Sequence, residues 1–454
     1  MGKTPVLVIS HDIIGPNMAG SGIRYQALAR VLAKDFPVIL AAPGNSHLSI
    51  EGIRFWPYEG ERWQSLAPAV NEATAVLLCG DVLDRFPQLM ETDVPIIMDG
   101  YDPHTVETLA LFAGESTQTQ RLQERARILS LQCLVGDFFI CASERQRTWW
   151  LGLLEAHGRV NPYTFDEDPA LRNLIDVVPF ALPSQPFSHA EIDIPEIAPE
   201  DKVLLWGGGV WEWLDPLTVI RAMPRILEDF PQAKLLFPGT RHPNPAVPAM
   251  RKVEEAKALV TELRLQDVVI FGDWVPREAW NAYLARADVG LSLHPDTYET
   301  HLAYRSRLLD YIWAGLPMVV THGDETSQLA PRFQLGRVVA YEDVVGVAAA
   351  VSDVLAEPKS AFSAGFAEAR QTLTWETAAQ PLIAFCRAPR RAPDKIALRD
   401  RLGNHYYEQK LQALRTERAH LLQQQAHLQN LVSGYEQGKF IRLMKWLHSI
   451  VGRG

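Results

Sequence analysis

The sequence has only four cysteines in 454 residues, and no two of them are close enough in sequence to form a CxxC pair. They are Cys79, Cys133, Cys141 and Cys386. A disulfide framework or a zinc knuckle is therefore not expected, and a reducing compartment is the simplest interpretation. The sequence also lacks an HExxH motif and a Ser-His-Asp order. We therefore predict no metal site and no metal cofactor.

Long apolar runs are missing as well. No stretch of about 18 apolar residues is present, which is the length that a membrane-spanning helix needs. The first residues, MGKTPVLVISHD, turn polar after one short apolar run. This start predicts a first β-strand rather than a signal peptide, and we expect a cytoplasmic protein.

Basic residues are fewer than acidic ones, 44 Lys and Arg against 54 Asp and Glu, so the formal net charge is −10. Positive charge is concentrated at one end: from Arg387 to Gly454 there are thirteen Lys and Arg against five Asp and Glu. The body before this tail is therefore strongly acidic. Such a surface argues against nucleic acid as a partner.

Short apolar runs alternate with amphipathic segments along most of the chain. Strands that read as continuous apolar runs, separated by helices, indicate parallel sheets covered on both faces. A first series has runs beginning at Val6, Val38, Ala75, Pro95, Phe138 and Ile175. A second series has runs beginning at Lys202, Lys234, Val268, Val289 and Met318. Between them, residues 183–200 are rich in Pro, Ser and acids, as is typical of a linker.

The sequence thus predicts an α/β protein with two Rossmann-like, doubly wound domains that face each other across a cleft. We place the first domain at 1–182, the linker at 183–200 and the second domain at 201–370. A segment at 371–388 follows, and a basic helical tail occupies 389–454. Ligands bind such sheets at the carboxyl ends of their strands.

The tail carries two patterns. Five residues recur every seven positions, with interruptions on the neighbouring stripe, so a coiled coil and a helix packed on its own body are both open. The repeat consists of Tyr407, Leu414, Leu421, Leu428 and Tyr435. The last segment, 439–451, predicts an amphipathic helix with basic residues beside its apolar face, which suits an anionic membrane surface or a docking partner. The apolar residues are Phe440, Leu443, Met444, Leu447 and Val451, and the basic ones are Lys439, Arg442 and Lys445.

Ionisable residues cluster after the predicted strand at Val289. Glu299, Arg305, Arg307 and Asp310 precede a helix that ends at Gly315-Leu-Pro317. A helix N-terminus and guanidinium groups suit a phosphate, and a carboxylate one turn later suits a ribose diol. The alternative is an exposed helix with charges at its start, and we favour the binding site.

One glycine-rich loop follows the first strand of each predicted domain. Gly207, Gly208 and Gly209 allow close approach of backbone to a phosphate, although a tight strand-to-helix turn needs the same residues. In the first domain, Gly20, Gly22 and Arg24 occupy the corresponding loop. Neither loop has the order of a dinucleotide fingerprint or a P-loop.

The stretch Asp310-Tyr-Ile-Trp-Ala-Gly-Leu-Pro-Met-Val-Val resembles the signature of the family 4 retaining glycosyltransferases of GT-B fold (glycosyl transferases group 1). Further short motifs occur in the order of that family over roughly residues 5–386. They include Ala142-Ser143, Val178-Pro179-Phe180, Phe271-Gly272, Ala287-Asp288-Val289 and Leu335-Gly336. The resemblance implies transfer of a sugar from a nucleotide-diphosphate donor, with retention and without a required metal.

The resemblance also assigns roles to residues. Asp310 stands where the family binds the donor ribose, Arg307 near the diphosphate, and Trp274 and Val275 beside the nucleobase. Asp99 and His104 follow the apolar run that begins at Pro95, where the family often places a His or acid near the transferred sugar. They are the candidates for acceptor activation or orientation, and a solvated loop residue is the alternative for His104. Residues 371–388 resemble the last helix of the family, which crosses back to the first domain.

This sequence departs from the family pattern at two places. The first acid of the family lies eight residues before the second, and Leu302 stands there; Glu299 is the nearest replacement. The second domain also lacks the usual Arg and Lys after its first strand, so Arg305 and Arg307 are proposed to supply the positive charge.

We therefore expect a glycosyltransferase that uses a nucleotide-sugar and a glycan or lipid-linked glycan acceptor, in polysaccharide or glycolipid assembly. Peripheral membrane contact and self-association through the tail are both open. Two alternatives remain: a nucleotide-sugar 2-epimerase of GT-B fold, and a catalytically inactive glycan-binding scaffold.

Overall fold

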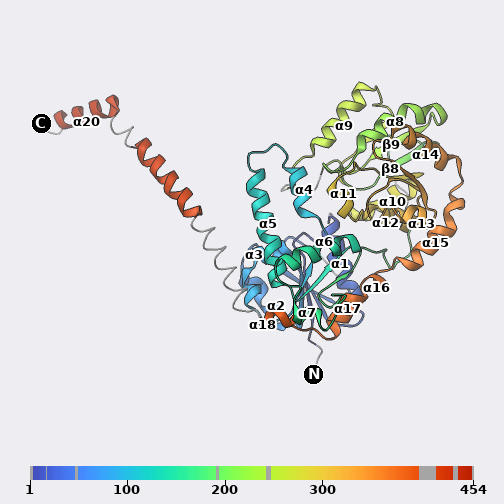
Figure 1. Ribbon diagram of the computed structural model, residues 1–454. Coiled ribbons are helices and arrows are strands. Elements are labelled where there is room, and N and C mark those ends of the chain that lie inside the picture. Colours follow the sequence, from blue (N-terminus) through green and yellow to red (C-terminus); the bar gives the residue numbers. More distant parts are fainter. Residues whose placement is uncertain are drawn as a thin grey trace. The chain divides into compact units, whose positions relative to one another are not determined.

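The computed structural model describes residues 4–16, 18–46, 50–190, 194–241, 247–397, 416–432 and 438–451. The chain divides into two units, Met1–Ile396 and Ala397–Gly454. The first unit contains two parallel β-sheets with helices on both faces of each (Figure 1). The predicted pair of doubly wound domains is confirmed.

The first sheet has seven parallel strands in the order β3-β2-β1-β4-β5-β6-β7. Its central strands are completely buried apolar runs, which is why they lie between two helical layers. The strands are β1 Val6–Ile9, β2 Val38–Pro43, β3 Ile53–Tyr58, β4 Ala75–Leu78, β5 Ile96–Asp99, β6 Phe138–Cys141 and β7 Ile175–Val177. The helices are α1 Gly20–Leu32, α2 Trp63–Glu72, α3 Gly80–Arg85, α4 His104–Leu111, α5 Gln118–Val135, α6 Glu144–Ala156 and α7 Pro162–Phe165, with a 3₁₀ turn at Pro87–Glu91.

The second sheet has six parallel strands in the order β10-β9-β8-β11-β12-β13. The strands are β8 Lys202–Trp206, β9 Ala233–Phe237, β10 Val269–Phe271, β11 Val289–Ser292, β12 Met318–Thr321 and β13 Gly336–Val339. The helices are α8 Pro216–Asp229, α9 Arg251–Glu262, α10 Arg277–Arg286, α11 Tyr298–Leu302, α12 Arg307–Ala314, α13 Leu329–Arg332, α14 Val344–Ala356 and α15 Ser363–Thr372, with a 3₁₀ turn at Lys359–Phe362.

Local sequence signals set where the helices of the second domain begin and end. The Asp215 side chain accepts a hydrogen bond from the Thr218 amide, and Pro216 follows as the first residue of α8. Gly315 ends α12 with a φ of 73°, a left-handed conformation that glycine adopts without strain. The Gly315 turn thus leads from α12 into β12, which begins at Met318.

The chain returns to the first domain after α15. Leu182 pairs with Thr374 in an isolated parallel bridge, and α16 (Trp375–Ala378) and α17 (Gln380–Arg387) follow. On α17, the Phe385 ring stacks on Phe138 of β6 with centroids 4.8 Å apart. Residues 371–388 thus pack against the domain from which the chain started (Figure 1).

Residues 389–396 also belong to this body. The guanidinium of Arg159 is paired with Asp394 of α18 (Pro393–Ala397), and both side chains are fully buried. Lys395 pairs with the buried Asp137 at 2.8 Å. The first unit therefore extends to Ile396, seven residues beyond the start that we expected for the tail at 389.

The described part of the tail consists of a helix at 416–432 and α20, Lys439–Val451. Of the seven-residue repeat, Leu421 and Leu428 are exposed on the first of these helices. Tyr407, Leu414 and Tyr435 lie outside the described residues. On α20, Leu443, Met444 and Leu447 are exposed. None of the described helices is long and apolar enough to cross a membrane.

Candidate functional site

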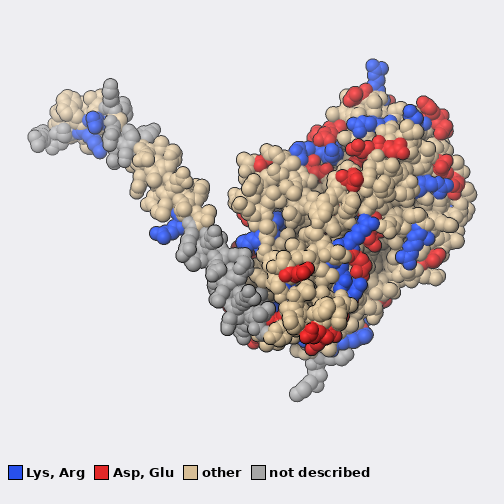
Figure 2. All heavy atoms as spheres, in the orientation of Figure 1, with Lys and Arg blue, Asp and Glu red and all other residues tan. Residues whose placement is uncertain are grey.

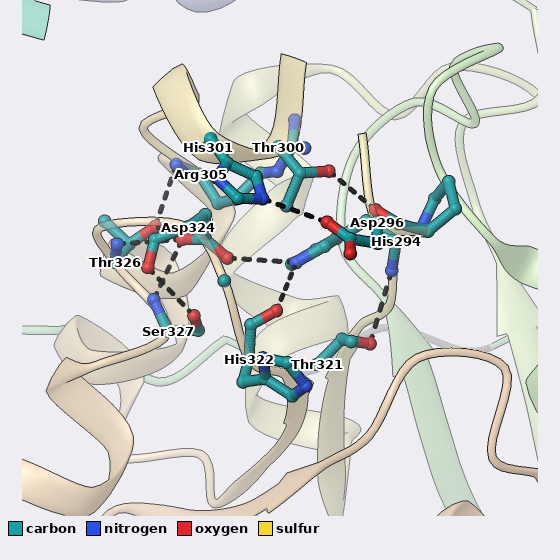
Figure 3. Close-up of polar contacts among 12 residues, drawn as sticks. His294, Asp296, Thr300, His301, Arg305, Thr321, His322, Asp324, Thr326 and Ser327 are labelled. Carbon is teal, nitrogen blue, oxygen red and sulfur yellow. Dashed lines mark hydrogen bonds and ion pairs between the residues drawn. The ribbon is translucent and has the colours of Figure 1, made fainter. Parts of the chain in front are cut away.

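A buried polar network joins the loops that follow β11 and β12 (Figure 3). His294 is completely buried, and its Nε2 lies 3.1 Å from the His322 carbonyl oxygen and 3.4 Å from Asp324 Oδ2. Asp324 accepts hydrogen bonds from the backbone amides of Thr326 and Ser327. Burial, and next the charge of Arg305, lower the pKa of His294 to about 4, so its imidazole is neutral at pH 7.

The network extends to Glu299 and Arg305, which contact each other. The Arg305 amide donates to the Thr326 hydroxyl at 2.8 Å. The guanidinium of Arg305 donates to both carboxylate oxygens of Glu299, at 2.7 and 2.6 Å, and both side chains are buried. Burial raises the pKa of Glu299, while Arg305 opposes that shift. Two of the predicted site residues thus form an internal ion pair.

Arg307 lies two residues further on, at the first position of α12, and is held differently. Its guanidinium lies 5.3 Å from the centroid of the Trp206 ring, and Nη2 donates to the Gly209 carbonyl oxygen at 3.0 Å. Nη1 is buried and has no hydrogen-bond partner among the described residues. Burial lowers the pKa of Arg307 to about 10, so the group stays cationic at pH 7.

Two of the three glycines after β8 are required structurally, Gly207 by packing and Gly208 by its backbone conformation. The Gly207 amide donates to the Tyr311 hydroxyl at 2.7 Å, and a Cβ on Gly207 would lie 2.6 Å from that oxygen. Gly208 has a φ of +75°, and its carbonyl lies close to Gly239 of the next loop. Gly209 uses its carbonyl to hold Arg307. The turn is thus explained structurally, and it also positions the buried cation.

Asp310 lies one turn after Arg307 on α12. Its Oδ2 accepts a hydrogen bond from Trp280 Nε1 of α10 at 2.9 Å. Trp274 and Val275 are half-buried in the loop between β10 and α10. All the predicted donor-binding residues therefore come from α12 and from loops or helices that follow strands of the second sheet.

In the first domain, Arg24 and Asp99 form a completely buried pair. The guanidinium donates to both oxygens of Asp99, at 2.7 and 2.9 Å, and to the Val178 carbonyl at 2.9 Å. It also lies against the ring faces of Tyr101 and Phe180. Arg24 thus connects the carboxyl ends of β5 and β7 from inside the fold.

The first-domain loop brings Gly20 and Gly22 to the start of α1. A Cβ on Gly22 would lie 2.8 Å from the Ile13 carbonyl, so the loop packs closely there, whereas Gly20 has open space around it.

His104 begins α4 and is half-buried. Its Nδ1 lies 3.9 Å from Glu107 Oε2. Burial, together with the charges of Asp102 and Glu299, raises the pKa of Glu107 well above its ordinary value. Glu107 and the His294–Asp324 pair were not predicted from the sequence. Their burial and charged neighbours arise only when the chain folds. A His directly after the β11 strand was the only available signal.

The two domains contact each other beside these groups. The Gln146 side chain of α6 donates to the Tyr101 carbonyl at 2.7 Å and to the Leu302 carbonyl at 2.8 Å. Tyr304 donates to the Phe180 carbonyl at 3.1 Å. Leu302, which occupies the position of the family's first acid, therefore contributes its backbone oxygen to a hydrogen bond that crosses the domains.

Comparison with known proteins agrees with this architecture. A family model described as glycosyl transferases group 1 matches residues 201–357, which is the second domain. No curated protein matches the sequence.

Several solved structures resemble the chain in fold. Sucrose-phosphate synthase from Thermosynechococcus elongatus is 15% identical with a TM-score of 0.57, over 85% of this chain and 98% of that one. Anabaena HepE, solved with UDP-glucose, is 14% identical with a TM-score of 0.56, over 84% and 98% of the two chains. WaaG, a glycosyltransferase involved in lipopolysaccharide biosynthesis, is 17% identical with a TM-score of 0.52, over 84% and 98%. The second domain therefore matches the glycosyl transferases group 1 model, and the chain shares the GT-B fold of these solved glycosyltransferases.

Proposed function

We propose that the chain transfers a sugar from a nucleoside diphosphate donor to an acceptor hydroxyl, with the diphosphate bound at Arg307 and the start of α12. The observation that carries this proposal is the state of Arg307. Its cationic side chain is half-buried, and its buried Nη1 has no hydrogen-bond partner among the described residues. A buried cation without a carboxylate is costly, and a bound anion would remove that cost.

The proposed mechanism needs no protein nucleophile. Arg307, the positive end of the α12 helix dipole and the backbone after β8 would stabilise the negative charge that develops on the departing diphosphate. The leaving phosphate would receive the acceptor proton on the same face, which retains the anomeric configuration. Charge stabilisation at a preformed site would then supply much of the rate.

The other predicted residues take supporting roles in this proposal. Asp310 would bind the donor ribose while Trp280 orients its carboxylate. Trp274 and Val275 would contact the base. Because Asp99 is occupied by Arg24 and Glu299 by Arg305, we assign both carboxylates to orientation rather than proton abstraction. His104, which is only half-buried, would contact the acceptor or the transferred sugar.

A panel of donors tests the proposal directly. UDP-, GDP-, ADP- and dTDP-sugars are added to the protein, and the melting temperature is measured. A ligand that binds only the folded state raises the melting temperature by mass action, so the donor class is expected to stand out. The same panel is repeated with Arg307→Ala, for which we expect the shift to disappear. Flat melting curves for all four donors would contradict the proposal.

For the acceptor, we propose a lipid-linked glycan at the inner surface of a membrane, in polysaccharide or glycolipid assembly. The basic tail supports this context. On α20, Arg442 and Lys445 accompany an apolar face, and Figure 2 shows blue spheres there with no red ones among the described residues of this helix. WaaG, which has the same fold, is a glycosyltransferase of lipopolysaccharide biosynthesis.

The tail proposal is tested with vesicles of phosphatidylcholine alone and with added phosphatidylglycerol. The full chain is expected to sediment with the anionic vesicles, and a variant with Arg442→Glu and Lys445→Glu is expected to remain in the supernatant. Each basic residue near an anionic surface contributes about 1 kcal/mol, so two reversals should abolish binding. Equal sedimentation of both proteins would contradict membrane contact through α20.

One observation favours a second candidate, a scaffold that binds a nucleotide-sugar without turning it over. The position of the family's first acid is Leu302, and the nearest acid, Glu299, is held by Arg305. Donor binding in the melting panel, without transfer to any acceptor or hydrolysis of the donor, would support the scaffold.

A further inference from the structure

Three potential metal ligands meet at the point of the first sheet where the strand order reverses. β1 lies between β2 and β4, and the chain runs from β1 to β3 on one side and continues from β4 on the other. The register pairs Val8 with Leu77, so the residues after these strands emerge next to each other. His11 follows β1, and Cys79 and Asp81 follow β4. Ligands bind doubly wound sheets in this crevice.

The three side chains are close enough to share one ion. Cys79 Sγ lies 3.1 Å from His11 Nδ1, and the ligand atoms of His11, Cys79 and Asp81 all lie within 4.8 Å of one another. Cys79 is 1% exposed, whereas His11 and Asp81 are half-buried and can be reached from solvent. The arrangement is thus an assembled set of sulfur, nitrogen and oxygen donors with an open side.

We infer that His11, Cys79 and Asp81 form a binding site for a transition-metal ion of the Zn²⁺ type. Thiolate, imidazole and carboxylate are the ligands that Zn²⁺ uses in proteins, and three protein ligands leave one position of a tetrahedral ion open. Binding releases the thiol proton of Cys79, and the resulting thiolate and the carboxylate together balance the charge of a divalent ion, so the ion and its three ligands are neutral as a set. Asp81 is also paired with Arg125, which orients its carboxylate.

A second group of ligands, Asp102, His104 and Glu107, is less suitable for such an ion. It contains no sulfur, and the contact between His104 and Glu107 is 3.9 Å. It also comes from a single loop and the first turns of α4. A metal that prefers thiolate is therefore expected to bind at His11, Cys79 and Asp81 and not at the second group.

A bound ion would fix the position of the loop that follows β1. Asp12 is next to His11, and it accepts hydrogen bonds from the Ile13 amide and the Ser21 hydroxyl at the start of α1. An ion on His11 and Cys79 would thus connect this loop to the turn after β4. This is an accessory site: the proposed transfer does not use the ion, and the inference does not depend on the proposed function. It departs from the prediction of no metal site, because His11 and Cys79 meet only in the folded chain.

The test uses Co²⁺, which reports its coordination by absorption. The full chain is stripped of metal with a chelator, kept reduced with a phosphine, and titrated with Co²⁺ without any nucleotide-sugar. We expect one equivalent to produce a thiolate-to-cobalt band in the near ultraviolet and intense visible bands typical of four-coordinate cobalt. Zn²⁺ should displace the ion, because it binds such sites more tightly than Co²⁺ does.

The variants distinguish this site from others. Cys79→Ser and His11→Gln are each expected to weaken Co²⁺ binding more than about 100-fold, since even the loss of an outer-shell partner costs about 10–100-fold. Cys386→Ser, which alters a buried thiol on α17, and Glu107→Gln, which alters the second group, should bind like the parent. If Cys79→Ser does not fold, His11→Gln carries the same test, because His11 is half-buried.

Several results would overturn the inference. They are the absence of a charge-transfer band in the parent protein, its persistence in Cys79→Ser or His11→Gln, and its loss in Glu107→Gln. Binding of several equivalents with no thiolate band would indicate surface carboxylates instead.

Discussion

Each domain places an arginine near the carboxyl ends of its strands, one fully buried and one half-buried, and the two cations have different surroundings. Arg24 in the first domain donates to both oxygens of Asp99 and is completely buried. Arg307 in the second domain has a tryptophan face and one carbonyl oxygen but no carboxylate partner among the described residues, and each of the two arginines leaves its Nη1 without a hydrogen-bond partner there. The difference indicates that a cation with its own carboxylate stabilises the fold, whereas a cation without one is available for a ligand.

The largest expected effect is on stability, from breaking the Arg24–Asp99 pair. Arg24→Met leaves Asp99 as a buried charge without a partner, which typically costs about 3–5 kcal/mol. Urea unfolding measures the change, and the double variant Arg24→Met, Asp99→Leu should recover most of it.

An exposed pair provides the control for this prediction. Lys34 and Glu376 are paired but 56% and 39% exposed. Lys34→Ala should therefore change the unfolding free energy by at most about 1 kcal/mol. A similar loss in Lys34→Ala and Arg24→Met would contradict the view that burial decides the effect.

The next effect is on activity, from replacing Arg307. Arg307→Ala should lower kcat/KM for the nucleotide-sugar by about 100- to 1000-fold, which is typical for the loss of one donor to a developing negative charge. Its unfolding free energy should fall much less than that of Arg24→Met. Arg307→Lys keeps the charge but not the two-pronged geometry, so we expect partial activity.

The matched control is Arg337→Ala, because Arg337 on β13 pairs with Glu357 and Asp353 at the protein surface. Donor kinetics of this variant should equal those of the parent. Unchanged kinetics in Arg307→Ala would reject the proposed phosphate role.

The smallest expected effect is on the pH dependence of stability, through the buried His294. The folded-state pKa of His294 is about 4, below its ordinary value of 6.5. The folded protein therefore binds fewer protons than the unfolded chain between these values, and stability falls as pH decreases through this window. Unfolding of His294→Gln should lack this part of the pH dependence, and identical pH profiles would contradict it.

Much of the fold was predictable from local patterns. Buried parallel strands read as apolar runs in both domains, and the two series and the confirmed GT-B architecture followed from them. The Asp310 to Val320 stretch also indicated the family, because the strand, helix and Gly315 turn of this segment are encoded within about a dozen residues.

The partners of charged side chains were not predictable. Arg305 and Arg307 look equivalent in the sequence, yet one is held by Glu299 and the other is not. Arg24 and Asp99 are 75 residues apart, and His11 and Cys79 are 68 residues apart. Such pairs arise from strand order, which places distant segments together and which no local period records.

The anchoring of residues 389–396 has a consequence for how the protein would be tethered. Asp394 and Lys395 fasten the chain to Arg159 and Asp137 of the first domain immediately before the tail begins. If the tail binds a membrane or a partner, force on the tail would therefore be transmitted to the first domain rather than to the second. The second domain could then release and bind its proposed nucleotide while the tail holds the first domain in place.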